Sequence, residues 1–128
     1  MPWVFRTYRR ASGRDDVREW YAGLAAGDRA VVLNVLQYLR ARERHQWERP
    51  DFAPLHGKCA GMGEVRFKFG GVQNRLIGFF GPYRMSFTLL LPVTKRGRTF
   101  DPRDWENTAI RRKGDVEADP GCTDVWLA

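Results

Sequence analysis

The side chains that could act on a polyanion are confined to one stretch of the sequence. Residues 56–103 carry nine lysines and arginines against two acidic residues, and this excess equals the whole net charge of +7. The rest of the chain has equal numbers of basic and acidic side chains. Lysine and arginine gathered in a folded region are the electrostatic signature of a polyanion site. Nucleic acid is therefore the first candidate partner.

Three groups of cations within this stretch are candidates to contact phosphate. Arg66 and Lys68 alternate on one expected strand, a pattern that is also typical of a solvated sheet face. Arg75 lies in the apolar segment NRLIGFF, so its guanidinium must reach a surface or bind an anion. A basic turn around Gly97 contains Lys95, Arg96 and Arg98. Such a turn suits phosphate, and equally a soluble sheet edge. Convergence of all three groups on one face favours the anion site.

Two further candidates stand just before the basic strand. His56 and Lys58 belong to the segment HGK, and either could act as a base, whereas a lone loop histidine is also commonly just solvated. The chain has no phosphate-binding glycine loop, no paired histidines and no nucleophile elbow. Cys59 and Cys122 lack metal-type spacing, and Cys59 is interpreted as a small buried or half-buried thiol. We therefore expect no metal and no cofactor.

The elements that must position these residues form one α+β domain over residues 1–128. A β-branched and aromatic segment at 3–8 predicts an N-terminal strand. Apolar residues at helical spacing from Val17 and again from Val32 predict two helices that pair antiparallel on one side of a sheet.

The basic stretch itself is expected to be an antiparallel three-stranded meander, with Gly70-Gly71 as its first turn. Its strands are expected at residues 64–69, 72–80 and 85–93. Asp101 and Pro102 predict the start of a short C-terminal helix. Gly114 is expected to end that helix, and residues 115–128 to form a loosely held tail. The predicted fold class is thus N-terminal strand, two-helix hairpin, three-stranded meander and short C-terminal helix.

No membrane association is expected. The apolar runs fall well short of the about 20 residues that span a bilayer. The first residues do not resemble a signal peptide, because Arg9 and Arg10 follow a short apolar start. We expect a cytoplasmic protein.

Four motifs, in this order and spacing, give the chain a resemblance to a known family. They are VREWYAGL, LHGKCAGMGEVRF, NRLIGFF and TKRGRTFDP. Over roughly residues 17–112 the chain resembles the RelE/ParE toxin superfamily, most closely its HigB-like, phage-derived branch. The resemblance implies a RelE-like fold and a metal-independent endoribonuclease that cuts mRNA on the ribosome. It also implies a co-expressed antitoxin with a helix-turn-helix domain, bound either to the basic sheet or to the outer side of the helix pair.

The family chemistry assigns roles to the candidate residues. A 2′-hydroxyl attacks the adjacent phosphate, and fixed cations stabilise the negative charge that develops. Arg75 is expected on the scissile phosphate, with Arg66 and either Lys95 or Arg96 beside it, and Lys58 or His56 as base. The residues expected to bind RNA are Lys68, Arg96, Arg98, Arg103 and Trp105.

One position departs from the family pattern. Several family nucleases place a tyrosine near the last helix, where this chain has Phe100 and Trp105. An aromatic ring can still stack on a base, but no phenol is available there as a proton donor. Two alternatives therefore stay open: a ParE-like toxin that inhibits gyrase, and a catalytically inactive binding module of RelE-like fold.

Overall fold

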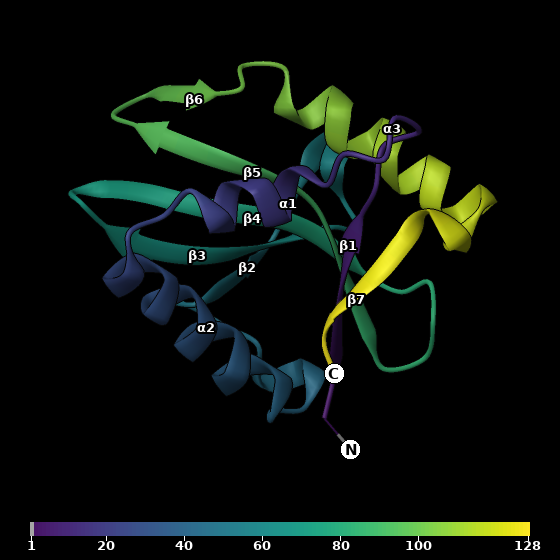
Figure 1. The fold of residues 1–128 in the computed structure, drawn as a ribbon, viewed down its shortest axis with the longest axis horizontal. Coiled ribbons are helices and arrows are strands. Elements are labelled where there is room, and N and C mark those ends of the chain that lie inside the picture. Colours follow the sequence, from purple (N-terminus) through teal and green to yellow (C-terminus); the bar gives the residue numbers. More distant parts are fainter. Residues whose placement is uncertain (1) are drawn as a thin grey trace.

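The computed structural model describes residues 2–128, which fold around one seven-stranded sheet in the order β2-β3-β4-β5-β1-β7, with β6 paired to β5 (Figure 1). The strands are β1 (Val4–Tyr8), β2 (Phe52–Pro54), β3 (Gly63–Phe69), β4 (Val72–Phe80), β5 (Ser86–Arg96), β6 (Thr99–Asp101) and β7 (Thr123–Leu127). The α-helices are α1 (Asp16–Ala22), α2 (Ala26–Arg40) and α3 (Trp105–Ala118). Short 3₁₀ helices are η1 (Arg44–Gln46), η2 (Gly57–Cys59) and η3 (Pro120–Cys122).

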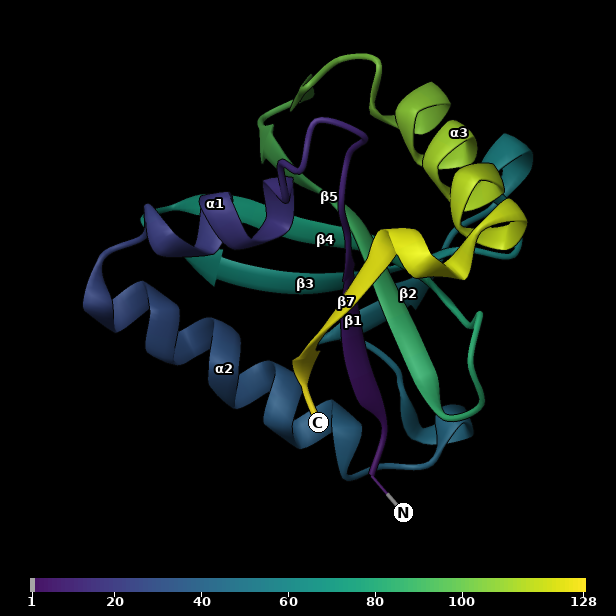
Figure 2. The ribbon, with the colours of Figure 1, turned by 45° about the vertical axis from the view of Figure 1, so that its right-hand side comes forward.

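Helices cover both faces of the sheet. Successive residues of a strand point to opposite faces, and the core divides accordingly. Leu76 and Leu89 pack in the cluster formed with α1 and α2, whereas their neighbours Ile77 and Leu90 pack in the cluster formed with α3. Figure 2 shows α1 and α2 together at the left of the strands and α3 at the upper right. The sheet therefore has a face bordered by α3 as well as the face that the two-helix pair covers.

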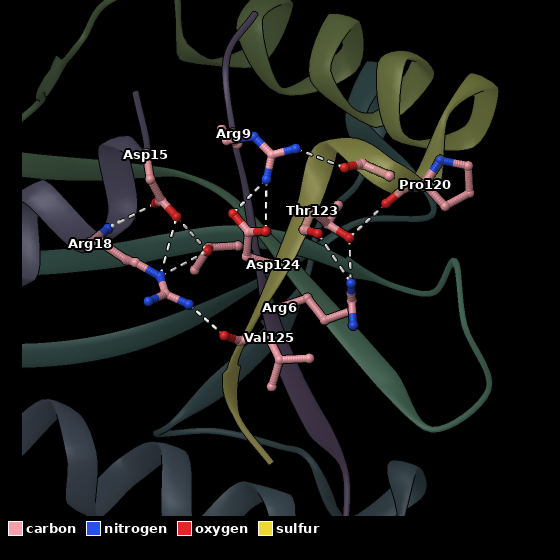
Figure 3. A network of polar contacts seen from close by, with 10 residues as sticks. Arg6, Arg9, Asp15, Arg18, Pro120, Thr123, Asp124 and Val125 are labelled. Carbon is pink, nitrogen blue, oxygen red and sulfur yellow. Dashed lines mark hydrogen bonds and ion pairs between the residues drawn. The ribbon is translucent and has the colours of Figure 1, made fainter. Parts of the chain in front are cut away.

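The C-terminal segment is an integral part of the sheet. β7 pairs antiparallel with β1, from Tyr8 opposite Thr123 to Phe5 opposite Leu127. Figure 3 shows how arginines hold it in place: Arg6 Nε donates to Thr123 Oγ1 at 2.8 Å, and the guanidinium of Arg18 donates to the carbonyl of Val125. The expectation of a loose tail over residues 115–128 is overturned, because these residues complete α3 and supply the partner strand of β1.

The predicted fold class is wrong. The sheet is mixed and seven-stranded, because β1 pairs in parallel with β5 and β7 adds beyond it, while β2 and β6 extend it elsewhere. Pairings of this kind join residues far apart in the chain and leave no local pattern. Asp101 also does not cap the last helix: it ends β6, and α3 begins at Trp105. Gly114 does not end α3, since a single exposed glycine costs a helix only about 1 kcal/mol.

Two local predictions are confirmed. The N-terminal strand is present as β1. Gly70 and Gly71 form the β3–β4 turn with φ of 61° and 69°, which suits a two-residue hairpin turn that needs positive φ at both central residues. The turn fixes the register that places Arg66 opposite Arg75.

Within residues 2–128, none of the helices combines the length and apolar character needed to cross a bilayer.

Candidate anion-binding site on the sheet

The centre of the candidate site is a pair of arginines on adjacent strands. Arg66 of β3 and Arg75 of β4 lie directly opposite one another. They share the sheet face of Ile77, which belongs to the cluster packed against α3, because alternate residues of a strand point the same way. Like charges directly opposite in a sheet are unfavourable. The pair therefore requires a compensating group.

Glu64 supplies the compensating charge. Its Oε1 accepts hydrogen bonds from Arg66 Nε at 3.0 Å and Arg66 Nη2 at 2.7 Å, and its Oε2 accepts one from Arg75 Nη1 at 3.1 Å. The Glu64 side chain is only 3% exposed, against 27% for Arg66 and 12% for Arg75. One positive charge remains uncompensated. We call Glu64, Arg66 and Arg75 the β3–β4 charge cluster.

Arg75 retains a donor without an acceptor. Its Nη2 donates to Gln73 Oε1 at 2.9 Å, whereas its Nε is buried and has no hydrogen-bond partner among the described residues. Buried polar atoms are nearly always satisfied, so an orphaned donor requires an explanation such as a missing ligand. Because this atom is closed to solvent, an anion could reach the Arg75 guanidinium only through its terminal nitrogens.

A second row of side chains borders the charge cluster on the same face. Lys68, Gln73 and Lys95 are successive cross-strand partners on β3, β4 and β5, two residues along from the arginine pair. Phe100 of β6 pairs with Lys95 and extends the row. The structure thus brings together cations from three strands beside an aromatic ring.

The ring of Phe100 connects the two rows. The Arg75 guanidinium carbon lies 5.7 Å from its centroid, and Lys95 Nζ lies 5.4 Å from it. Trp105 lies beside Phe100, with ring centroids 5.9 Å apart. Cations over an aromatic face gain favourable electrostatic energy, so Phe100 holds both side chains near one place.

The other cations near the basic turn are more exposed, and Arg96, which follows Lys95 on β5, points to the opposite face of the sheet. Arg96 ends β5, Arg98 lies in the β5–β6 turn and Arg103 precedes α3, all of them exposed. Arg98, Arg103 and Phe100 line a small hollow of about 260 Å³. Such mobile surface cations suit contacts to a phosphate backbone.

The two candidate bases, His56 and Lys58, are not bonded to the charge cluster. Lys58 Nζ contacts Asn107 Oδ1 at 3.3 Å and Glu106 Oε1 at 4.0 Å, so η2 presents it to α3. His56 is exposed. In the part of the chain that the structure describes, no hydrogen bond or ion pair joins His56 or Lys58 to the charge cluster. Neither residue is therefore bonded to the cations with which it was grouped.

A hollow of about 390 Å³ adjoins the charge cluster at the edge of the sheet. β2 pairs only with the first three residues of β3, from Gly63 to Val65, so the second half of β3 lies at an open edge. Val31 and Val35 of α2 line the hollow together with Arg66 and Lys68. An apolar wall beside cations is the kind of surroundings that a nucleobase attached to a bound phosphate would need.

Sequence reasoning missed Glu64 and Gln73. Glu64 was visible only as one of two acids in a basic stretch. Its position two residues before Arg66, on the same strand face, is the signal that could have identified it. Gln73 carried no comparable signal, because its contact with Arg75 depends on the side-chain geometry of the folded hairpin.

The other reactive groups of the chain do not form a site. Among residues 2–128, no three His, Cys, Asp or Glu side chains gather closely enough to hold a metal ion. Cys59 is buried, as predicted, and burial followed by the nearby charge of Glu106 raises the pKa of its thiol. A thiol of this kind is a poor nucleophile at neutral pH.

Comparison of the chain with protein-family models, with curated proteins and with solved structures found no significant match.

Proposed function

We propose that this protein is a metal-independent endoribonuclease that cuts mRNA on the ribosome, acting as the toxin of a type II toxin–antitoxin pair of the RelE/ParE superfamily, HigB-like branch. The observation that carries the proposal is the opposed pair Arg66 and Arg75, held by a buried carboxylate and flanked by Lys68 and Lys95. The motif resemblance also supports it, since Arg66, Arg75 and Lys95 belong to the motifs.

Cleavage of RNA without a metal requires strong stabilisation of charge on phosphate. When the 2′-hydroxyl attacks, the oxygens of the phosphate gain negative charge, and preorganised donors stabilise them by several kcal/mol. Arg75 has second N–H groups on Nη1 and Nη2 beyond those used on Glu64 and Gln73, and Arg66 has N–H groups beyond those used on Glu64. These donors would bind the non-bridging oxygens of the scissile phosphate.

Lys95 is the best-placed group for proton transfer. It lies over the same Phe100 ring as Arg75. Positioned acid–base groups contribute about 10²–10⁴-fold to a rate. The exposed cations Arg96, Arg98 and Arg103 would hold the RNA backbone, and Phe100 or Trp105 would stack on a base.

A second candidate function is RNA binding without cleavage. It is favoured by one observation: in the described part of the chain, no hydrogen bond or ion pair joins the charge cluster to a histidine or a tyrosine. Such a module would bind RNA through the same cations and leave it intact.

Arg75→Ala tests the proposal against its rivals. Expression of the native chain in a bacterium should arrest growth and produce discrete cuts in translated messages. Arg75→Ala should lower cleavage by about 10²-fold or more, because a donor to the transition state is lost. Arg84→Ala is the matched control, since Arg84 is exposed, lies in the same basic stretch and is outside the site.

Three results would contradict the proposal. Growth arrest with intact messages and damaged DNA would favour gyrase inhibition. RNA that is bound and never cut would favour the binding module. Equal loss of activity in the Arg75 and Arg84 variants would show that total charge matters and the site does not.

The toxin role also requires a protein partner. A nuclease with an uncovered basic surface would damage its own cell, so we propose a cognate antitoxin with a helix-turn-helix DNA-binding domain encoded beside it. A native genome without a small neighbouring reading frame would count against the toxin role.

A further inference from the structure

Glu64 is a buried carboxylate whose two oxygens are both directed at arginines of adjacent strands. Carboxylates this deeply buried are costly unless charged partners satisfy them. The arginines have no such need, because both reach the surface in part. A neutral residue could therefore fill this buried position with less desolvation. Because stability does not explain a carboxylate at this position, we ask what else Glu64 does.

The geometry indicates what Glu64 does to the two guanidinium groups. Arg66 and Arg75 are opposed like charges and would separate without a counter-charge. Glu64 binds the Nε–Nη2 edge of Arg66 and the Nη1 of Arg75, while Gln73 binds the Nη2 of Arg75. Of the five N–H donors on each guanidinium, those that remain include Arg66 Nη1 and the second N–H groups of Arg75 Nη1 and Nη2. Their relative position is fixed by one carboxylate.

We propose that Glu64 is a positioning residue for the phosphate site: it fixes the separation of Arg66 and Arg75 so that both bind one phosphate of the RNA. This inference rests on the proposed function. Positioning of donors matters most in the transition state. Glu64 should therefore govern kcat, while the exposed cations around the cluster govern affinity.

Substitution of Glu64 separates positioning from simple electrostatics. Glu64→Gln makes the surface more basic by one charge, so attraction of RNA alone would keep or strengthen binding. Loss of positioning would nevertheless lower the rate. The inference thus predicts opposite changes in affinity and in kcat, which a purely structural or purely electrostatic role does not.

The experiment measures single-turnover cleavage, binding of an uncleavable 2′-deoxy oligonucleotide by fluorescence anisotropy, and thermal unfolding. We expect Glu64→Gln to lower kcat by about 10²-fold with a Kd no weaker than that of the native chain. Glu64→Asp keeps the charge and is one methylene shorter, so it should also lose about tenfold in kcat.

Asp16 provides a matched control away from the site. Its carboxylate likewise accepts from two arginines, Arg10 and Arg112, each at 2.8 Å. Asp16→Asn should lower the unfolding temperature and leave kcat unchanged.

The possible results of these measurements distinguish the inference about Glu64 from the nuclease proposal. Native kcat in Glu64→Gln would overturn the inference and leave the nuclease proposal standing. Equal loss of kcat in Asp16→Asn would overturn it too, because activity would then follow stability. If Glu64→Gln does not fold, Glu64→Asp decides by the same measurements. A native chain that neither binds nor cuts RNA would overturn both proposals, and that measurement comes first.

Discussion

At the scale of single residues, carboxylates paired with arginines recur at two places, one buried at Glu64 and one partly buried at Asp16. Glu64 joins two cations at the candidate site. Asp16 joins α1 to α3, since Arg112 contacts it and also donates to the Leu90 carbonyl at 2.9 Å. Through the Leu90 carbonyl, this second cluster contacts β5 between the segment paired with β1 and the segment paired with β6. The first therefore serves the site and the second serves the fold.

Asp16 should make stability depend on acid pH. Burial opposes ionisation of its carboxyl group, but hydrogen bonds from Arg10 and the charge of Arg112 outweigh burial and lower its pKa below 3.8. Because the folded-state pKa is depressed, the stabilisation is present above pH 3.8 and is lost as pH falls through the folded value. The free energy of unfolding of the native chain should drop in this range.

Asp16→Asn checks that expectation. The variant should be less stable than the native chain at pH 7, and the difference should narrow at pH values below 3.8, measured by denaturant unfolding. A difference that stays constant across this range would show that the carboxylate does not titrate with folding.

At the scale of elements, side-chain hydrogen bonds and an ion pair hold β7 against β1. Thr123 is buried, accepts from Arg6 and donates to the Pro120 carbonyl at 2.9 Å. Arg9 adds an ion pair with Asp124 at 2.7 Å. β7 thus depends on polar anchors at its start, close to η3.

Thr123→Val should weaken this pair. The substitution keeps the shape and removes the acceptor of Arg6 Nε, so the free energy of unfolding should fall by about 1–3 kcal/mol. Val125→Thr in the same strand is the control, because Val125 is 46% exposed and should change stability by less than about 0.5 kcal/mol. Equal effects of both changes in denaturant unfolding would show that the anchor is dispensable.

At the scale of the whole molecule, the distribution of charge decides how a partner would bind. The basic stretch has few acidic neighbours, and the cluster itself keeps a net positive charge after Glu64 is counted. The opposite face is covered by α1 and α2, where Tyr38 and Arg42 lie together on the surface. An antitoxin could cover either region.

We expect the antitoxin to cover the basic surface through acidic side chains. The purified complex should then dissociate in about 1 M salt, where the Debye length is about 3 Å. Size-exclusion chromatography at low and high salt measures this directly. A complex that survives high salt would indicate an apolar interface on the helix pair and an open basic surface.

Some features were determined by the sequence because they depend on neighbours along the chain. The N-terminal strand follows from its residue types, and the Gly70-Gly71 turn follows from the need for positive φ. Strand alternation also placed Arg66 and Lys68 on one face, and the Gly70-Gly71 turn places Arg75 opposite Arg66. Local conformational preference and period were enough for these.

Other features were decided only by the tertiary structure because they join residues distant in the chain. The pairing of β1 with β5 and β7 turned an expected small meander and a loose tail into one mixed sheet. The location of Lys58 against α3 and the contact of Phe100 with Arg75 depend on where α3 and β6 pack. Above all, the enclosure of Glu64 by two arginines requires the burial of that face of the hairpin, which has no local pattern in the sequence.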